Sequence, residues 1–189
     1  MMQTLWDLLP KRRPAPPAKP VRPTEHRRVK QEPNQAAGQQ PKPGSMAERY
    51  ERMTRAMLAE HGIRVRKWRS GMTGVAWQVR YRDGTTSKLI ESPRPRGPMS
   101  AAVFLHEIGH HAIGFDRYKP RCLEEYHAWA YSLEQMQRWQ LNITDGVRTR
   151  MHESLWYAVE KAKRRGLKRI PAELEPFTAT PTRFARKTQ

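Results

Sequence analysis

The chain of 189 residues is long enough for one domain of modest size, and it carries a net charge of +18. Its single cysteine, Cys122, excludes an internal disulfide and a zinc site built from several cysteines. No apolar run is long enough for a membrane span and no secretory signal is present, so we expect a cytoplasmic protein without a membrane partner.

Both ends of the chain have the composition of unfolded segments. Residues 1–45 hold nine prolines and nine Lys or Arg against three acids, which predicts a disordered, Pro-rich basic arm. Residues 171–189 show no periodicity and are predicted to form a basic tail. A net charge of +12 remains outside the arm. A field of this sign favours a polyanion, so we expect DNA or RNA to associate through the basic surface and tails, mainly at phosphates.

Residues 46–170 are predicted to form one α+β domain with about three strands. A helix with apolar residues on one face is expected first, closed by Gly62. Alternating side chains then predict strands, with Asp83-Gly84 as a hairpin turn before the third. The expected elements of this first half are a helix over residues 47–60 and strands over residues 63–68, 75–81 and 87–91.

The next predicted helix begins at Pro98 and carries the run His106-Glu107-Ile108-Gly109-His110, an H-E-x-x-H motif. Histidines at i and i+4 lie on one helical face, close enough to share a metal ion. Glu107 points to the same side, where it can activate a water at the metal instead of binding the ion. This pattern predicts a zinc site in which His106 and His110 are ligands and Glu107 is the catalytic base.

A catalytic zinc ion needs a third protein ligand, and four residues downstream are candidates: Asp116, Glu124, Glu125 and His127. The last three lie on a predicted helix that begins at Arg121. On a helical wheel Glu125 borders the apolar face, Glu124 points to solvent and His127 lies on the opposite flank. We therefore expect Glu125 to be the third ligand, with the other three as alternatives.

The last predicted helix spans residues 145–165 and ends at Gly166. Its apolar face is predicted to hold Val147, Met151, Leu155, Ala158 and Ala162. His152 on this helix, and Tyr126 on the preceding one, are considered as helpers of the reaction.

The motif followed by Glu125-x-x-Ala128-Trp129-Ala130 resembles compact gluzincin-type metallopeptidases, and most closely the ImmA/IrrE-type family. The resemblance implies a small zincin-like fold in which two histidines and a glutamate from a second helix hold Zn²⁺. It covers roughly residues 85–140. The family usually carries an E-A-N-x-F-A run on the second helix, and here Tyr126 and His127 replace its Ala-Asn pair.

The predicted function is a zinc-dependent endopeptidase that hydrolyses a protein substrate near nucleic acid. The alternative is a basic nucleic-acid-binding accessory protein whose metal site is structural or vestigial, with His127 or His111 as a fourth ligand.

Overall fold

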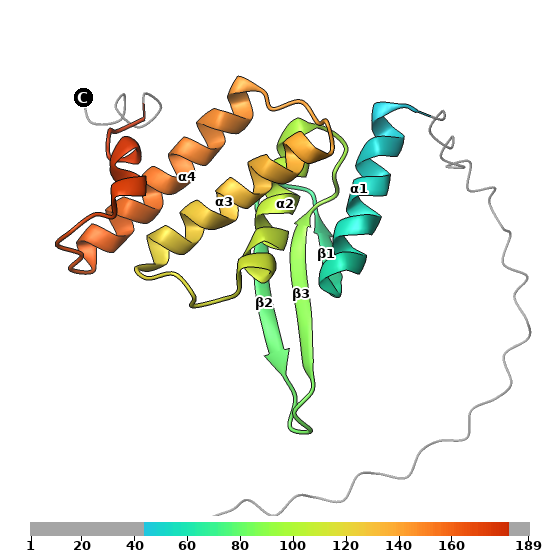
Figure 1. The fold of residues 1–189 in the computed structure, drawn as a ribbon, viewed down its shortest axis with the longest axis horizontal. Helices are drawn as coiled ribbons and strands as arrows, with labels where there is room; N and C mark the ends of the chain where they lie inside the picture. Colours follow the sequence, from blue (N-terminus) through green and yellow to red (C-terminus); the bar gives the residue numbers. More distant parts are fainter. Residues whose placement is uncertain (1–43, 182–189) are drawn as a thin grey trace, which may run out of the picture. The chain divides into compact units, whose positions relative to one another are not determined.

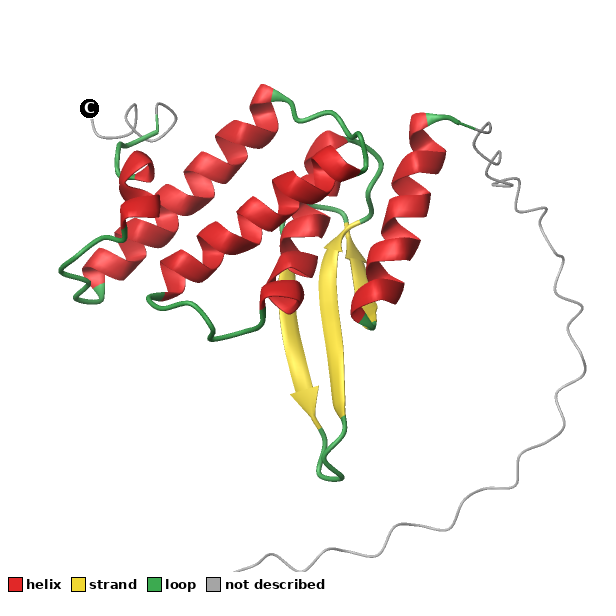
Figure 2. Cartoon of the chain, in the orientation of Figure 1, coloured by secondary structure: helices red, strands yellow, loops and turns green. Residues whose placement is uncertain are grey.

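The computed structural model describes residues 44–181 of the chain and has an α+β fold, as the sequence predicts (Figures 1 and 2). The elements in chain order are α1 (Met46–His61), β1 (Ile63–Arg69), β2 (Val75–Arg80), β3 (Thr86–Pro93), α2 (Pro98–Ile113), α3 (Arg121–Arg138), α4 (Asp145–Arg164) and a 3-10 helix, η2 (Ala172–Phe177). The predicted arm, apart from its last two residues, and the end of the predicted tail lie outside the described residues. The domain limits therefore stay predictions.

The three strands form one mixed sheet in the order β1-β3-β2. β3 lies in the middle, parallel to β1 and antiparallel to β2. The hairpin between β2 and β3 turns at Asp83-Gly84 as predicted: Gly84 has a φ of 85°, and the Asp83 carboxylate accepts hydrogen bonds from the backbone and hydroxyl of Thr85. Figure 1 shows this turn extending beyond the ends of the helices.

Helix α1 begins and ends with the caps that its sequence supplies. The Ser45 hydroxyl accepts a hydrogen bond from the backbone N–H of Glu48, and Gly62 closes the helix at a φ of 61°. Tyr50, Met53 and Met57 form its buried face. That face packs against α2 and β1.

Helix α2 is buried on every side from Ser100 to His111. It contacts the sheet, α1, α3 and α4, so its apolar residues have a packing partner in each direction. Pro98 occupies the first turn, where a missing N–H costs nothing. The Ser100 hydroxyl accepts hydrogen bonds from the N–H groups of Arg96 and Gly97 and fixes the chain entering the helix.

Helices α2 and α3 pack closely because small residues meet between them. A Cβ atom added at Gly109 would lie 2.8 Å from the carbonyl oxygen of Ala128. On the same side of α3, the hydroxyl of buried Ser132 donates to the carbonyl of Ala102 on α2. This contact determines how near α3 lies to His106 and His110.

Helix α4 begins after Thr144, whose hydroxyl accepts a hydrogen bond from the N–H of Val147. Its predicted apolar face packs into the core, with Val147 and Leu155 fully buried. No element was predicted after Gly166, but η2 packs against α3 and α4 and buries Leu174 completely. Among residues 44–181 no helix combines the length and apolarity needed to cross a bilayer.

Candidate metal centre and cleft

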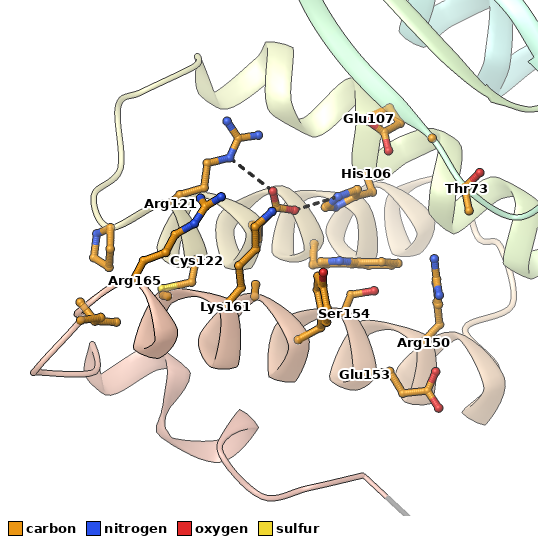
Figure 3. A pocket seen from close by; sticks show the side chains of 18 of the residues that line it. Thr73, His106, Glu107, Arg121, Cys122, Arg150, Glu153, Ser154, Lys161 and Arg165 are labelled. Carbon is orange, nitrogen blue, oxygen red and sulfur yellow. Dashed lines mark ion pairs between the residues drawn. The ribbon is translucent and has the colours of Figure 1, made fainter. Parts of the chain in front are cut away.

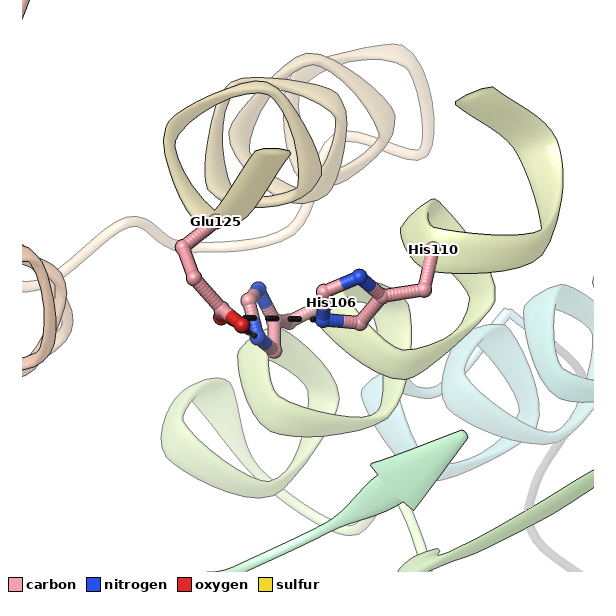
Figure 4. Close-up of side chains that lie close together, drawn as sticks. All are labelled: His106, His110 and Glu125. Atoms are coloured by element: carbon pink, nitrogen blue, oxygen red, sulfur yellow. Dashed lines mark ion pairs between the residues drawn. The ribbon is translucent and has the colours of Figure 1, made fainter. Parts of the chain in front are cut away.

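His106 and His110 of α2 and Glu125 of α3 come together as a group that can hold a metal ion (Figure 4). The Glu125 Oε2 atom lies 3.4 Å from Nε2 of His106 and 3.6 Å from Nε2 of His110. One ligand atom from each residue lies within 4.8 Å of the other two. Of the four candidates for the third position, only Glu125 is in this group.

The types of donor atom and the distances between them suit an ion with tetrahedral coordination. Zinc bonds of the usual length place neighbouring ligand atoms about 3.3 Å apart, close to the distances between Glu125 and the two histidines. Two imidazole nitrogens and one carboxylate oxygen are donors that favour zinc among the common divalent ions. Burial opposes the charged form of Glu125. Its hydrogen bond from His106 and the charges of His110 and Arg121 nevertheless hold its pKa at about 2, so it is available as an anion.

The position of Glu124 differs from the one that the helical wheel predicts. Expected to face solvent, its side chain is only 1% exposed, and its Oε1 atom lies 3.2 Å from Nδ1 of His110. Its other oxygen accepts a hydrogen bond from the backbone N–H of Asp116 in the α2–α3 loop. The hydrogen bond with His110 lowers the Glu124 pKa. A charged carboxylate on Nδ1 orients the ring and leaves Nε2 free for a metal.

The helical wheel predicts an apolar face of Cys122, Tyr126, Trp129, Leu133 and Met136. Only Cys122, Trp129 and Met136 of these are buried, and the buried face of α3 extends beyond them to smaller and polar residues. Ala128, Ser132 and Gln135 are buried against neighbouring elements, whereas Tyr126 and Leu133 are only half-buried. Small side chains allow the two helices to approach closely, and an apolar pattern does not detect them. The true buried face is therefore rotated toward Glu124 relative to the predicted one.

His106 is oriented by an aromatic contact. Its ring stacks on Trp129 of α3 with the centroids 4.6 Å apart, and its buried Nδ1 atom has no hydrogen-bond partner in the part of the chain that the structure describes. The rings of His106 and His110 meet edge to face with their centroids 4.7 Å apart, and the Nε2 atoms of both approach Oε2 of Glu125. Stacking on Trp129 thus orients the His106 ring, whereas the Glu124 carboxylate contacts a ring nitrogen of His110.

Glu107 lies beside this group without belonging to it. It is 5% exposed and lines the cleft together with His106 and Glu125. Burial raises the pKa of its carboxyl to about 7, the range in which a group can both accept and return a proton. Gly74, just before β2, makes room for it: a Cβ atom there would collide with the Glu107 carboxyl.

The other side chains named from the sequence lie elsewhere. The ring of His127 stacks on that of Tyr118 with the centroids 3.8 Å apart. Nε2 of His111 forms a hydrogen bond with the backbone carbonyl of Leu89. Neither joins the group of possible ligands within the described residues, and neither does Asp116. Tyr126 and His152, considered as helpers, contact Phe177 of η2 and do not line the cleft.

A cleft of about 1090 Å³ opens beside the ligands, with α4 as its far wall (Figure 3). Side chains of α4 that line the cleft follow one another at helical spacing: Arg150, Ser154, Tyr157 and Lys161. Arg165, just after the helix, also lines the cleft. Figure 3 shows Arg121, Lys161 and Arg165 gathered at one end, with Glu107 and Thr73 toward the other. This wall was not predicted, although a polar stripe at i, i+4, i+7 and i+11 beside the apolar face of α4 is its sequence signal.

Comparison of the chain with protein-family models, with curated proteins and with solved structures finds no match in any of the three.

Proposed function

We propose that the protein is a zinc-dependent endopeptidase of the gluzincin type, similar to the ImmA/IrrE-type proteins. The observation that carries the proposal is the juxtaposition of His106, His110 and Glu125 with a buried Glu107 at the edge of a large cleft. Three protein ligands with an open side are the arrangement of catalytic zinc sites.

In this proposal, the residues around the cleft would take the following parts in a hydrolytic reaction. Zinc bound at the three ligands would polarise the scissile carbonyl and acidify water. Glu107 would accept a proton from the attacking water and deliver it to the leaving amine, a role that its buried carboxyl at the edge of the cleft suits. Glu124 keeps His110 in the tautomer that presents Nε2.

The length of the cleft favours an endopeptidase. Its α4 wall runs from Arg150 to Arg165, about 22 Å of helix, which matches roughly six residues of extended peptide. Thr73 and Gly74 line the cleft immediately before β2, which is an edge strand. An extended substrate can pair with such an edge through its backbone.

A purely structural metal site is a poorer account of the same residues. Structural zinc sites are usually closed by a fourth protein ligand, and the group found among residues 44–181 has three members. A structural site also gives no role to the buried carboxyl of Glu107, whose desolvation is costly.

The first experiment is elemental analysis of the purified full-length protein after zinc reconstitution. We expect about one zinc ion per chain by the tetrahedral-site argument, with loss or marked weakening in His110→Ala and in Glu125→Gln. His127→Ala, which removes a histidine outside the group, is the matched control and should keep its zinc. Absence of zinc from the wild type, or equal zinc in all four proteins, would contradict the proposed centre.

The second experiment separates catalysis from metal binding. Glu107→Gln should retain zinc and lose at least about 10²-fold in turnover of a fluorescence-quenched peptide library, because the amide cannot accept the proton. Circular dichroism checks that the variant is folded. Turnover at the wild-type rate in zinc-loaded Glu107→Gln would refute the mechanism.

A further inference from the structure

The two faces of the sheet differ in what they contact. One face carries Ile63, Val65, Ala76 and Ile90. Ile63 and Ile90 are part of the hydrophobic core, and Val65 and Ala76 pack against it. α1 and α2 are the helices that contact the strands. The centroid of the Trp68 ring lies 6.1 Å from that of Phe104 of α2, on the same face of the sheet, which is the inner face.

The outer face carries apolar side chains that the core does not use. Side chains alternate along a strand, so residues paired across the sheet share a face. Trp77 on β2 pairs with Leu89 on β3, which pairs in turn with Arg64 on β1. Val75 lies in the next outer row, and neither it nor Trp77 nor Leu89 is part of the core or packed against it. Within residues 44–181, this apolar row faces away from every helix that packs on the sheet.

Basic side chains border the same row. β1 contributes Arg64, Arg66, Lys67 and Arg69, the alternation being shifted by a bulge between Val65 and Lys67. The acid on this face of β3 is Glu91, which accepts hydrogen bonds from Arg66 at 2.6 Å and from Arg69 at 3.0 Å.

Within residues 44–181, two of these cations have no acidic partner. Arg64 donates only to the hydroxyl of Ser87, and neither Arg64 nor Lys67 forms an ion pair among the described residues. The face therefore has a positive surplus at its β1 side. Its apolar row lies on β3 and β2.

The guanidinium of Arg66 lies over the Trp77 ring, 5.7 Å from its centroid, and so links the two sides across β3. A base has a flat apolar face and a phosphate beside it. Bases stack on exposed aromatic rings and guanidinium planes while phosphates take neighbouring cations. We propose that the outer face of the sheet binds single-stranded nucleic acid, with a base at Trp77 and Arg66 and phosphates at Arg64 and Lys67.

Other occupants fit less well. In a duplex the bases stack on one another, so their faces are not available to stack on the Trp77 ring. A second copy of the chain would bring two faces of like charge together. The proposal does not depend on peptidase activity, because the residues of this face are distinct from those of the metal centre.

Fluorescence anisotropy of the full-length protein with a labelled oligo-dT strand tests the site. Arg64→Glu with Lys67→Glu should lower the affinity by about tenfold or more and reduce the slope of log K against log salt by about 1.4, for two lost phosphate contacts. The matched control is Arg52→Glu with Arg55→Glu, which makes the same charge change on exposed positions of α1 and should cost less than about threefold through the long-range field alone. The basic ends of the chain are present in all variants, so their contribution cancels.

Trp77→Leu tests the stacking component. It should weaken oligo-dT binding by roughly fivefold or more and leave binding to a duplex of equal length unchanged. Thermal melting followed by circular dichroism should show that the variant is folded, since Trp77 is outside the core. Equal losses in the sheet and α1 double variants, or unchanged oligo-dT affinity in Trp77→Leu, would overturn the site. Competition by polyglutamate as strong as that by unlabelled oligo-dT would instead assign the face to an acidic protein.

Discussion

Glu124 and Gly74 show how single residues adjust a site to which they contribute no metal ligand. Glu124 holds Nδ1 of His110, and Gly74 leaves the space that the Glu107 carboxyl occupies. Neither residue belongs to the H-E-x-x-H motif. Their effect passes through a neighbouring side chain whose orientation or position they determine.

Replacing Glu124 by Gln should weaken zinc binding by about 10- to 100-fold, because a neutral amide no longer fixes the His110 ring or increases its basicity. Competition against a chelating fluorophore measures this affinity. Glu134→Gln, on the exposed side of the same helix, is the control and should bind zinc like the wild type. Unchanged affinity in Glu124→Gln would show that the 3.2 Å contact with His110 has no influence on the metal.

The packing of α2 against α3 decides whether Glu125 can reach the two histidines. At the contact, Gly109 faces the Ala128 backbone, one turn of helix from Glu125. Gly109 occupies a variable position of the H-E-x-x-H motif. In this fold the position is restricted to the smallest residue by the packing of the partner helix.

Gly109→Ala should therefore destabilise the protein, although alanine is the better helix former. The added methyl meets backbone, which cannot move away easily, and overpacking of this kind costs about 1–3 kcal/mol. The gain in helix propensity is only about 1 kcal/mol. We expect a lower melting temperature and weaker zinc affinity, since α3 must shift away from α2. Gly71→Ala is the control, because a Cβ there meets no described atom within 4 Å. A variant as stable as the wild type would contradict the close-packing argument.

At the scale of the whole molecule, the cleft has a cationic end formed by two helices and the segment that follows α4. Arg121 at the start of α3 is held by Glu125, whereas Lys161 and Arg165 form no ion pair among the described residues. A peptide in the cleft would meet this positive charge on one side of the metal centre. If the proposed peptidase activity holds, we expect a preference for substrate peptides that place an acidic side chain at the cationic end of the cleft.

Lys161→Glu with Arg165→Glu should lower kcat/KM for peptides with an Asp or Glu at the preferred position by about tenfold, and leave neutral peptides nearly unchanged. A library that varies each position around the scissile bond measures the preference. Arg164→Glu with Lys168→Glu changes charge equally outside the cleft lining and is the control. An equal loss for neutral and acidic peptides would place these cations outside substrate recognition.

Local geometry allowed much of this protein to be predicted from its sequence. The α+β order of elements, the turn at Asp83-Gly84 and the shared face of His106 and His110 all follow from contacts within a few residues. Such features depend on backbone hydrogen bonding and side-chain periodicity, which a short segment determines by itself. For the same reason Glu107 could be placed beside the candidate metal site from its spacing alone.

The tertiary structure decided what lies between elements. It placed Glu125 within 3.6 Å of both histidines, buried Glu124 against His110, brought Gly74 up to Glu107 and made α4 the wall of the cleft. It also left the outer face of the sheet without a covering helix among the described residues. These distances depend on how closely helices approach and which side of a sheet they cover. Packing determines both, and small residues such as Gly109 and Ala128 direct it without an apolar pattern that the sequence would reveal.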